Sequence, residues 1–346
     1  MMLGSNVGID LGTTSIIIYL EGKGIVVNEP CAIAYDEDNR ILCVGKNAEE
    51  MSERNHDGIR VVHPMADGVI SDFTATKHIV SYFLSRVCKN MIFRPNVVVC
   101  VPSMVTNLEK RTVLSLINAA GAAKACLIEE PLAAALGAGL QSDRPKGVLV
   151  VDIGGGTTDV AIITMGCISV SRSVRTAGNE FNEAIIRQLR RERDFVIGER
   201  TAEQIKEKIG SATLRDTELA MTVKGKSYLS NTPCTFEVTS TEVFLAMRPK
   251  LEIILDTIRK VLEEAPPDLA ADIIDSGIYL TGGSARLRYL DKMIERKTGI
   301  KTKAVTEPEK CVALGTGKAL ADMDILANNG YVFKARTGKE KSESAG

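Results

Sequence analysis

The sequence of 346 residues has no tryptophan and only three histidines, and its eight cysteines are scattered along the chain. His56, His63 and His78 lack the spacing of metal ligands, and no two cysteines form a C-x-x-C motif. These absences argue against a zinc site, a histidine-based hydrolase and a disulfide framework. We therefore expect the cysteines to be reduced thiols of a cytosolic protein.

The sequence also lacks a large net charge and a long apolar run. The formal net charge is −1, so overall electrostatics give no attraction to nucleic acid. No apolar run approaches the ~18 residues that span a bilayer, and the N-terminus MMLGSNVGID has no secretory signal. With 45% hydrophobic and 25% charged residues, the chain has the composition of a globular cytoplasmic protein and the length for two domains.

The strongest organising feature is an internal repeat. Residues 7–19 read VGIDLGTTSIIIY, and residues 150–163 read VVDIGGGTTDVAII. Each copy has an apolar segment ending at an aspartate, then a turn of glycine and threonine, then a second apolar segment rich in β-branched residues. The repeat predicts two similar domains that face each other, each containing one such β-hairpin.

Between and after the two copies, the hydrophobic pattern alternates between helix and strand. Thr106–Glu109 and Thr201–Gln204 have the form of capping boxes, which begin helices. Helices are predicted over 74–90, 106–121, 201–209, 240–264, 285–299 and 311–323, and strands over 96–102 and 277–283. This alternation predicts an α/β fold with layered sheets, and the polar tail over 328–346 is expected to be disordered.

Three glycine-containing turns indicate a phosphate site. Glycines let consecutive backbone N–H groups approach an anion, and threonine hydroxyls add further donors. Two turns follow Asp10 and Asp152, and the third is TGG at 281–283. Because both aspartates end their strands, we expect them to point into one cleft, where two carboxylates beside a polyphosphate suit Mg²⁺ held largely through water. The spacing matches neither a P-loop nor a Rossmann fingerprint.

These motifs resemble those of a known superfamily. DLGTT, DIGGGTTD and TGGS resemble the two phosphate hairpins and the adenosine loop of the actin/Hsp70/sugar-kinase proteins. Longer blocks such as GKGIVVNEP, VPSMVTNLEKR, LIEEPLAAALGAGL and CVALGTGKAL resemble the MreB family of bacterial actins, and the resemblance runs from about residue 7 to 326. The first and last turns depart from the usual family pattern, DLGTTS replacing DLGTAN and TGGS replacing TGGG.

The resemblance implies an actin-like ATPase fold with two RNase H-like domains, each carrying a smaller subdomain, and a nucleotide in the central cleft. Domain I is expected over 1–145 plus 315–330, with an insert at about 33–65. Domain II is expected over 146–314, with an insert at about 181–244.

The resemblance also implies residue roles. Asp10 and Asp152 correspond to carboxylates that organise Mg²⁺. Glu130, which by itself has the features of a structural charge at a helix start, corresponds to the catalytic residue that positions the attacking water. The expected contacts to ATP or ADP are Gly12, Thr13, Thr14, Ser15, Gly154, Gly155, Gly156, Thr157, Gly178, Glu203, Lys206, Glu207, Gly282, Gly283, Ser284 and Ala285.

The function implied by the resemblance is that of a bacterial cytoskeletal ATPase. Such a protein would form homopolymeric filaments at the inner face of the cell membrane and organise cell-wall synthesis with the elongation machinery, maintaining rod shape. Three alternatives use the same turns: an Hsp70-like chaperone ATPase, a small-molecule kinase and a DNA-segregating actin-like protein. We expect no substrate-binding domain after residue 326, where only a short polar tail is present, and the sequence specifies no sugar pocket.

Two surface features have two interpretations each. Met91, Ile92 and Phe93 lie between Lys89 and Arg94, so they either insert weakly into an anionic membrane or close the core below the preceding helix. Many copies in a filament would be needed for firm membrane attachment. A second feature is a cluster of four arginines, which forms either a solvated helix face or a filament contact: Arg187, Arg190, Arg191 and Arg193. No aromatic platform accompanies the cluster, so nucleic acid is not an expected partner.

Overall fold

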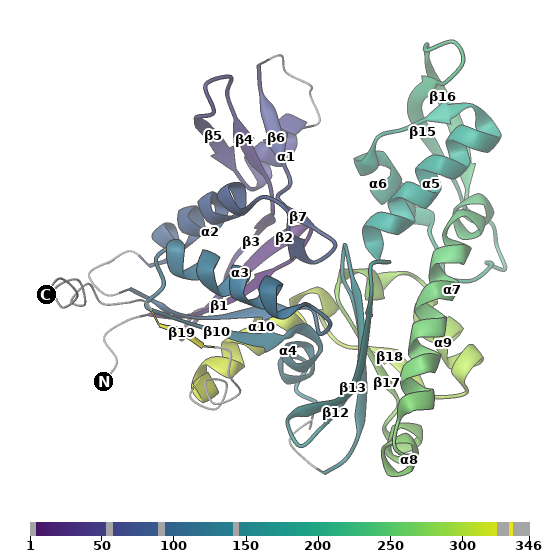
Figure 1. The fold of residues 1–346 in the computed structure, drawn as a ribbon. Helices are drawn as coiled ribbons and strands as arrows, with labels where there is room; N and C mark the ends of the chain where they lie inside the picture. The colour runs from purple at the N-terminus through teal and green to yellow at the C-terminus, as the bar shows by residue number, and fades with distance from the viewer. Residues whose placement is uncertain (1–4, 53–57, 89–93, 141–144, 324–331, 335–346) are drawn as a thin grey trace, which may run out of the picture. The chain divides into compact units, whose positions relative to one another are not determined.

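The structure is a computed structural model that describes residues 5–52, 58–88, 94–140, 145–323 and 332–334. The chain divides into two compact units, one formed by Met1–Gly137 with Val312–Gly346 and the other by Ala138–Cys311 (Figure 1). We call these unit 1 and unit 2. The proposed membrane-contact residues Met91, Ile92 and Phe93 lie outside the described residues.

Unit 1 is built on a mixed sheet with the strand order β19-β10-β9-β1-β2-β3. Its strands are β1 (Asn6–Leu11), β2 (Ser15–Leu20), β3 (Gly24–Pro30), β9 (Asn96–Val101), β10 (Lys124–Glu129) and β19 (Val332–Lys334). β1 pairs antiparallel with β2 and parallel with β9, and β10 pairs parallel with β9. Strands β9 and β10 read as continuous apolar runs because helices cover both faces of the sheet.

Four helices cover this sheet: α2 (Phe73–Val87), α3 (Asn107–Ala119), α4 (Glu130–Gly137) and α10 (Cys311–Ala319). Val7 and Ile9 of β1 belong to the core that also contains residues of α2 and α3. Gly8 lies between them in the sequence and faces Thr316 of α10, since a Cβ at Gly8 would lie 2.5 Å from the Thr316 hydroxyl oxygen. The alternation of β1 therefore places α2 and α3 on one face and α10 on the other (Figure 1).

Smaller elements complete unit 1. A three-stranded sheet, β5-β4-β6, packs with α1, and β7 and β8 form a short hairpin. Their bounds are β4 (Ile33–Tyr35), β5 (Ile41–Val44), α1 (Lys46–Ser52), β6 (Arg60–Val62), β7 (Met65–Ala66) and β8 (Val69–Ile70).

Unit 2 repeats the same hairpin within a sheet of order β13-β12-β11-β17-β18. Its strands are β11 (Val148–Ile153), β12 (Thr158–Thr164), β13 (Cys167–Val174), β17 (Ile278–Thr281) and β18 (Thr302–Ala304). β11 pairs antiparallel with β12 and parallel with β17, as β1 does with β2 and β9. The internal repeat is thus confirmed as two hairpins, each flanked by a parallel strand.

The helices of unit 2 form its own core with this sheet. They are α5 (Gly178–Arg193), α6 (Glu199–Ile209), α7 (Ser240–Glu264), α8 (Pro267–Ser276) and α9 (Leu290–Thr298), with the 3₁₀ turns η1 (Gly283–Arg286) and η2 (Pro308–Lys310). The long α7 packs along β12 and β13. A second sheet, β14-β15-β16, is formed by β14 (Phe195–Val196), β15 (Ala220–Ser227) and β16 (Pro233–Thr239).

The structure confirms several predicted elements and corrects others. Thr106 forms the expected capping box with Glu109. The box predicted at Thr201 is wrong, because α6 begins one turn earlier with Gly198 as its N-cap, and Thr201 lies inside the helix. The helix predicted over 285–299 is interrupted at Tyr289, whose φ of 61° is left-handed.

The chain near the C-terminus also differs from expectation. Residues 332–334 form β19 and pair antiparallel with β10, so this part of the tail expected to be disordered is a strand. The apolar triplet YVF within the polar tail is the sequence feature that predicts it. The helix predicted over 311–323 ends at Ala319 and continues as the 3₁₀ turn η3 (Leu320–Asp322).

None of the helices in the described part of the chain has the length and apolar character of a membrane-spanning segment.

All eight cysteines are free, and Cys167 alone is exposed. Cys167 follows the tight turn of the β12–β13 hairpin, where Met165 and Gly166 have φ values of 51° and 73°. Two successive positive φ values are typical of the turns that match hairpin twist.

Candidate functional site

The first hairpin turn of unit 1 is closed by its own backbone and fastened to a neighbouring hairpin. The N–H of Gly12 donates to the carbonyl of Ser15 at 2.9 Å, which sets the turn between β1 and β2. The Thr13 hydroxyl accepts a hydrogen bond of 2.9 Å from the N–H of Gly68, in the turn between β7 and β8. Thr14 is exposed at the tip of the turn. The turn is therefore held in one conformation while it presents polar groups to solvent.

Asp10 lies at the end of β1 beside a thiol. The Cys100 Sγ–H, from the neighbouring strand β9, donates to Asp10 Oδ1 at 3.3 Å. Burial raises the pKa of Asp10 to about 6, and the thiol hydrogen bond partly opposes this rise. Burial also raises the pKa of Cys100 well above its usual range, and the charges of Asp10 and Glu130 add to the effect. Cys100 is therefore a protonated donor at neutral pH.

Glu130 lies where β10 passes directly into α4. It is the first residue of α4 and only 8% exposed. The preceding Glu129 accepts a hydrogen bond of 3.1 Å from Nζ of Lys110, a buried lysine on α3. Asp10, Cys100 and Glu130 thus occupy the carboxyl ends of three neighbouring strands, β1, β9 and β10. Ligands of sheets with parallel strands bind at this edge.

In unit 2, Asp152 corresponds to Asp10 and accepts a hydrogen bond from a stronger donor. The Thr281 hydroxyl donates to Asp152 Oδ1 at 2.6 Å, and both side chains are buried. Thr281 ends β17 and pairs with Asp152 in the parallel register of β11 and β17. The following turn is closed as in unit 1, since the N–H of Gly154 donates to the carbonyl of Thr157 at 2.9 Å. Asp152 is therefore fixed at the mouth of the longer glycine turn.

The glycine turn of unit 2 caps a helix with its own carbonyls. The N–H of Gly178 donates to the carbonyl of Gly154 at 3.2 Å, and the N–H of Asn179 donates to that of Gly155 at 2.8 Å. The N-cap residue of α5, Ala177, has no side chain able to do this. The turn and the start of α5 are thus a single backbone unit.

Three elements converge on Gly178. The Ser284 hydroxyl donates to the carbonyl of Gly154 at 2.7 Å, and Nζ of Lys206 donates to the carbonyl of Gly178 at 3.2 Å. A Cβ at Gly178 would lie 2.7 Å from the Ser284 hydroxyl oxygen and 3.5 Å from Lys206 Nζ. Burial lowers the pKa of Lys206, and the carboxylates of Glu203, Glu207 and Glu199 oppose this change. α5, α6 and η1 therefore meet at a position that only glycine fits.

The third turn also contains a position that only glycine fits, Gly282. Its φ is 81°, and a Cβ there would lie 2.3 Å from the carbonyl oxygen of Ile153. Next to it, Gly283 is exposed and Ala285 is buried. Arg286 donates to the two carboxylate oxygens of Glu309 at 2.9 and 2.8 Å, which ties η1 to η2. The third turn is thus held against the end of β11.

Of the sequence-predicted residues of unit 2, Gly154, Lys206 and Ser284 lie around Gly178. Glu203 and Glu207 are exposed on α6, the helix that carries Lys206. The sequence analysis missed Cys100, Lys110 and Thr281. Cys100 and Thr281 each lie beside an aspartate on the next parallel strand, and this position depends on the strand register rather than on a local sequence pattern. A buried lysine such as Lys110 likewise has no local sequence signal.

The arginine cluster of α5 has local partners. Arg187 pairs with Glu183, Arg190 lies over the ring of Tyr228, Arg191 bonds Gln188, and Arg193 bonds Glu242. These contacts agree with a solvated helix face stabilised by its own neighbours.

The donor set of the two hairpins suits phosphate and a hard cation. Backbone N–H groups and hydroxyls bind phosphate oxygens, and carboxylate oxygens suit Mg²⁺ that keeps water in its coordination shell. Among the described residues, no group of three or more histidine, cysteine, aspartate or glutamate side chains is arranged to hold a metal by itself.

Comparison with known proteins decides the family. The model of the family described as "MreB/Mbl protein" matches residues 4–328. The chain belongs to the MreB/Mbl family. MreB, a cell shape-determining protein of Escherichia coli strain K12, is 42% identical over 331 residues, which cover 94% of this chain and 95% of that protein. Mbl, a cell shape-determining protein of Bacillus subtilis, is 38% identical over 327 residues, covering 94% and 98%.

A solved structure of an MreB/Mbl protein shows the same fold. MreB5 of Spiroplasma citri bound to ADP superimposes with a TM-score of 0.89 at 36% identity, covering 95% of this chain and 100% of that structure. The same protein has also been solved with AMPPNP. The actin-like fold expected from the sequence is thereby confirmed.

Proposed function

We propose that this MreB/Mbl family member binds ATP and ADP with Mg²⁺ and hydrolyses ATP. The observation that carries the proposal is the repeated hairpin, in which a hydrogen-bonded aspartate at a strand end precedes a glycine and threonine turn in each unit. The nucleotide-bound structures of Spiroplasma citri MreB5 support it, because that relative covers 95% of this chain.

The proposed nucleotide contacts fall into two groups. Phosphate oxygens accept hydrogen bonds from the turns over 12–15 and 154–157. The adenosine contacts the cluster around Gly178, where Ser284, Gly154 and Lys206 crowd the position of a side chain. Exposed Glu203 and Glu207 on α6 provide acceptors for hydroxyl and amine groups of the nucleoside.

Asp10 and Asp152 would hold Mg²⁺ through its water ligands. When bound, the metal neutralises charge on the phosphates. The protein's contribution is to fix the two carboxylates, Asp152 through the Thr281 hydroxyl and Asp10 through the Cys100 thiol. Fixed carboxylates lose little freedom on binding, which favours affinity.

Glu130 is the proposed catalytic residue. Its carboxylate accepts a hydrogen bond from the attacking water and orients it toward the terminal phosphate, because phosphoryl transfer depends mainly on positioning and charge stabilisation. Its backbone is fixed as the first residue of α4, and only 8% of the residue is exposed.

The decisive experiment compares Glu130→Gln with Glu129→Gln, a matched change in the adjacent carboxylate. We expect Glu130→Gln to bind ATP with near-normal affinity and to hydrolyse it at least about tenfold more slowly. Glu129→Gln should retain most of the hydrolysis rate. Normal hydrolysis by folded Glu130→Gln would refute the catalytic assignment.

We further propose that the chain forms filaments at the inner face of the cell membrane and helps to determine rod shape through cell-wall synthesis. Membership of the MreB/Mbl family supports this, since the curated relatives are cell shape-determining proteins. Pelleting with lipid vesicles in ATP and Mg²⁺, followed by negative-stain microscopy, tests it. Absence of filaments while nucleotide is bound would count against the proposal.

Membrane attachment is proposed through Met91, Ile92 and Phe93. The combined change Ile92→Ser and Phe93→Ser should reduce co-sedimentation with anionic vesicles and leave ATP binding unchanged. Undiminished vesicle binding by this folded variant would contradict the assignment.

A further inference from the structure

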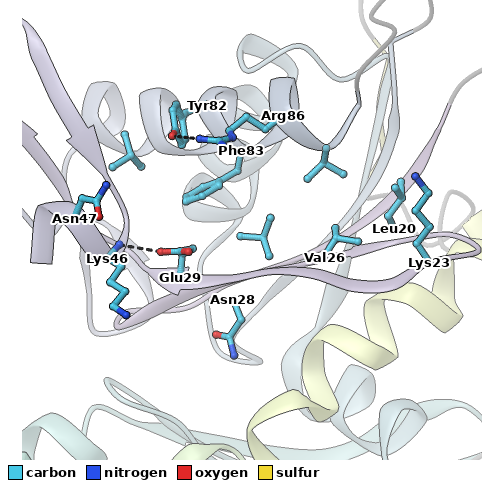
Figure 2. A pocket seen from close by; sticks show the side chains of 13 residues that line it. Leu20, Lys23, Val26, Asn28, Glu29, Lys46, Asn47, Tyr82, Phe83 and Arg86 are labelled. Carbon is cyan, nitrogen blue, oxygen red and sulfur yellow. Dashed lines mark hydrogen bonds between the residues drawn. The ribbon is translucent and has the colours of Figure 1, made fainter.

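A pocket with a volume of about 550 Å³ lies in unit 1 between β3 and α2. Its apolar lining includes Val26 and Val27 from β3, Val44 from β5, and Phe83 and Val87 from α2. Figure 2 shows the Phe83 ring on the helix side, facing the strand that carries Val26 and Glu29. None of the residues assigned above to nucleotide or Mg²⁺ lines this pocket. Its size is within the range of ligand-binding pockets.

The strand beside the pocket is the edge of the main sheet. Within the described part of the chain, β3 pairs only with β2. The N–H of Cys31 donates to the carbonyl of Thr14 at 3.0 Å, so Cys31 faces β2. In an antiparallel strand, the backbone N–H and carbonyl of successive residues point alternately toward and away from the neighbouring strand. Asn28 therefore points its backbone N–H and carbonyl away from β2. Among the described residues no hydrogen bond reaches either group.

The rim of the pocket carries an excess of positive charge. Lys23, Lys46 and Arg86 line it, against the single carboxylate of Glu29. That carboxylate accepts the backbone N–H of Lys46 at 2.9 Å (Figure 2). Neither Lys23 nor Lys46 forms an ion pair with any residue that the structure describes. An acidic group placed beside either lysine would gain a cation without displacing an existing ion-pair partner.

Two features limit how much backbone pairing this edge can offer. The β2–β3 register shifts between Ile18 and Tyr19, which places an irregularity next to Val26. Pro30 ends the strand and has no N–H. Bulges and prolines at an edge restrict strand addition to a short segment. Side-chain insertion and charge must therefore supply most of the affinity of any occupant.

We propose that the β3 edge and the pocket under α2 dock a short extended segment of a partner protein, with an apolar side chain in the pocket and carboxylates near the two ends of β3, at Lys23 and at Lys46 (Figure 2). The backbone of the segment pairs with Asn28 and extends the sheet by one strand. Extended peptides bind other proteins in this way, taking affinity from main-chain hydrogen bonds and specificity from side-chain pockets. The surface already exposes apolar area, since Val26 is 40% and Tyr82 38% exposed.

A random peptide library displayed on phage and selected on the full chain provides the probe. The expected result is enrichment of peptides that combine an aliphatic or aromatic residue with Asp or Glu. Dissociation constants of the enriched peptides are then measured by fluorescence polarisation. Asn28→Pro removes the outward N–H without touching the β2 ladder, whereas Asn28→Ala keeps that N–H. We expect Asn28→Pro to weaken binding at least about tenfold and Asn28→Ala to leave it within about twofold.

Charge is tested by the double variant Lys23→Glu with Lys46→Glu. It should lose binding to the acidic peptide and regain it with a peptide whose Asp or Glu is replaced by Lys. Normal thermal unfolding and ATP binding show that the variants are folded. The proposal is overturned if no peptides with apolar and acidic residues are enriched, or if Asn28→Pro binds the peptides as tightly as Asn28→Ala. It is also overturned if the double lysine variant changes vesicle binding and leaves peptide binding intact.

Discussion

The hydroxyl of Thr281 donates a 2.6 Å hydrogen bond to Asp152 from the next parallel strand. Its counterpart in unit 1 is the thiol of Cys100, which donates to Asp10 at 3.3 Å. A hydroxyl is a strong donor and a thiol a weak one. The two repeated hairpins therefore hold equivalent carboxylates with unequal strength.

The first prediction concerns Thr281→Val, which removes the hydroxyl at nearly constant volume. The lost hydrogen bond should weaken Mg²⁺–ATP binding by about 3- to 10-fold, which corresponds to roughly 0.5–1.5 kcal/mol. Thr281→Ser keeps the donor and should bind like the wild type. Titration with a fluorescent ATP analogue measures both. Equal affinity of the Val and Ser variants would contradict a positioning role.

The second prediction concerns the weaker donor. Cys100→Val removes the thiol hydrogen bond to Asp10 and should cost less affinity for Mg²⁺–ATP than Thr281→Val does, by about 0.5 kcal/mol or more. Cys100→Ser supplies a hydroxyl and should bind at least as tightly as the wild type. Titration with the fluorescent ATP analogue measures the affinity of both Cys100 variants. Equal losses in the two valine variants would show that the asymmetry has no energetic consequence, and a larger loss for Cys100→Val would contradict its direction.

The third prediction is a pH dependence. Arg286 lowers the pKa of Glu309 below its usual value of 4.5, chiefly through the side-chain hydrogen bond. A lowered carboxylate pKa gives stability that is present above 4.5 and is lost as the pH falls through the folded-state value. Because Arg286 is largely exposed, Arg286→Gln should cost only about 0.5–1 kcal/mol at pH 7.

Urea unfolding of wild type and Arg286→Gln between pH 7 and pH 2.5 checks this. The difference in unfolding free energy should stay constant down to about pH 5 and shrink as the pH falls below 4.5. A difference that stays constant down to the acid end would mean that the pair contributes through packing alone.

The fourth prediction concerns Gly315 of α10. A Cβ at this position would lie 1.8 Å from the carbonyl oxygen of Ala133 on α4, which cannot move without shifting the helix. Gly315→Ala should therefore destabilise the protein by about 2 kcal/mol or more. Gly198→Ser is the matched control, since nothing lies within 4 Å of a Cβ there and serine is a good N-cap. Thermal unfolding should separate the two variants by several degrees.

The two hairpins can be predicted from the sequence because each is a local pattern of strand, turn and strand. Asp10, Asp152 and their glycine turns could therefore be identified without the structure. The bond between Thr281 and Asp152 joins residues 129 positions apart, so it depends on the parallel register of β11 and β17. No local pattern encodes that register.

Other features depend on competition between similar local choices. Thr201 and Gly198 both precede helical sequence, and the helix begins directly after Gly198. The pocket beside β3 requires α2 and β5 to pack against the sheet edge, which only the folded chain specifies. The nucleotide-binding pattern was therefore predictable, whereas the residues that hold it and the second surface were not.

Cys167, at the exposed turn of the β12–β13 hairpin, has a practical consequence. The other seven cysteines are buried or half-buried. A maleimide dye added to the native protein should thus attach mainly at one position in unit 2. Cys167 lies in none of the proposed nucleotide or peptide contacts, so a dye there would report on an unmutated chain without touching either proposed site.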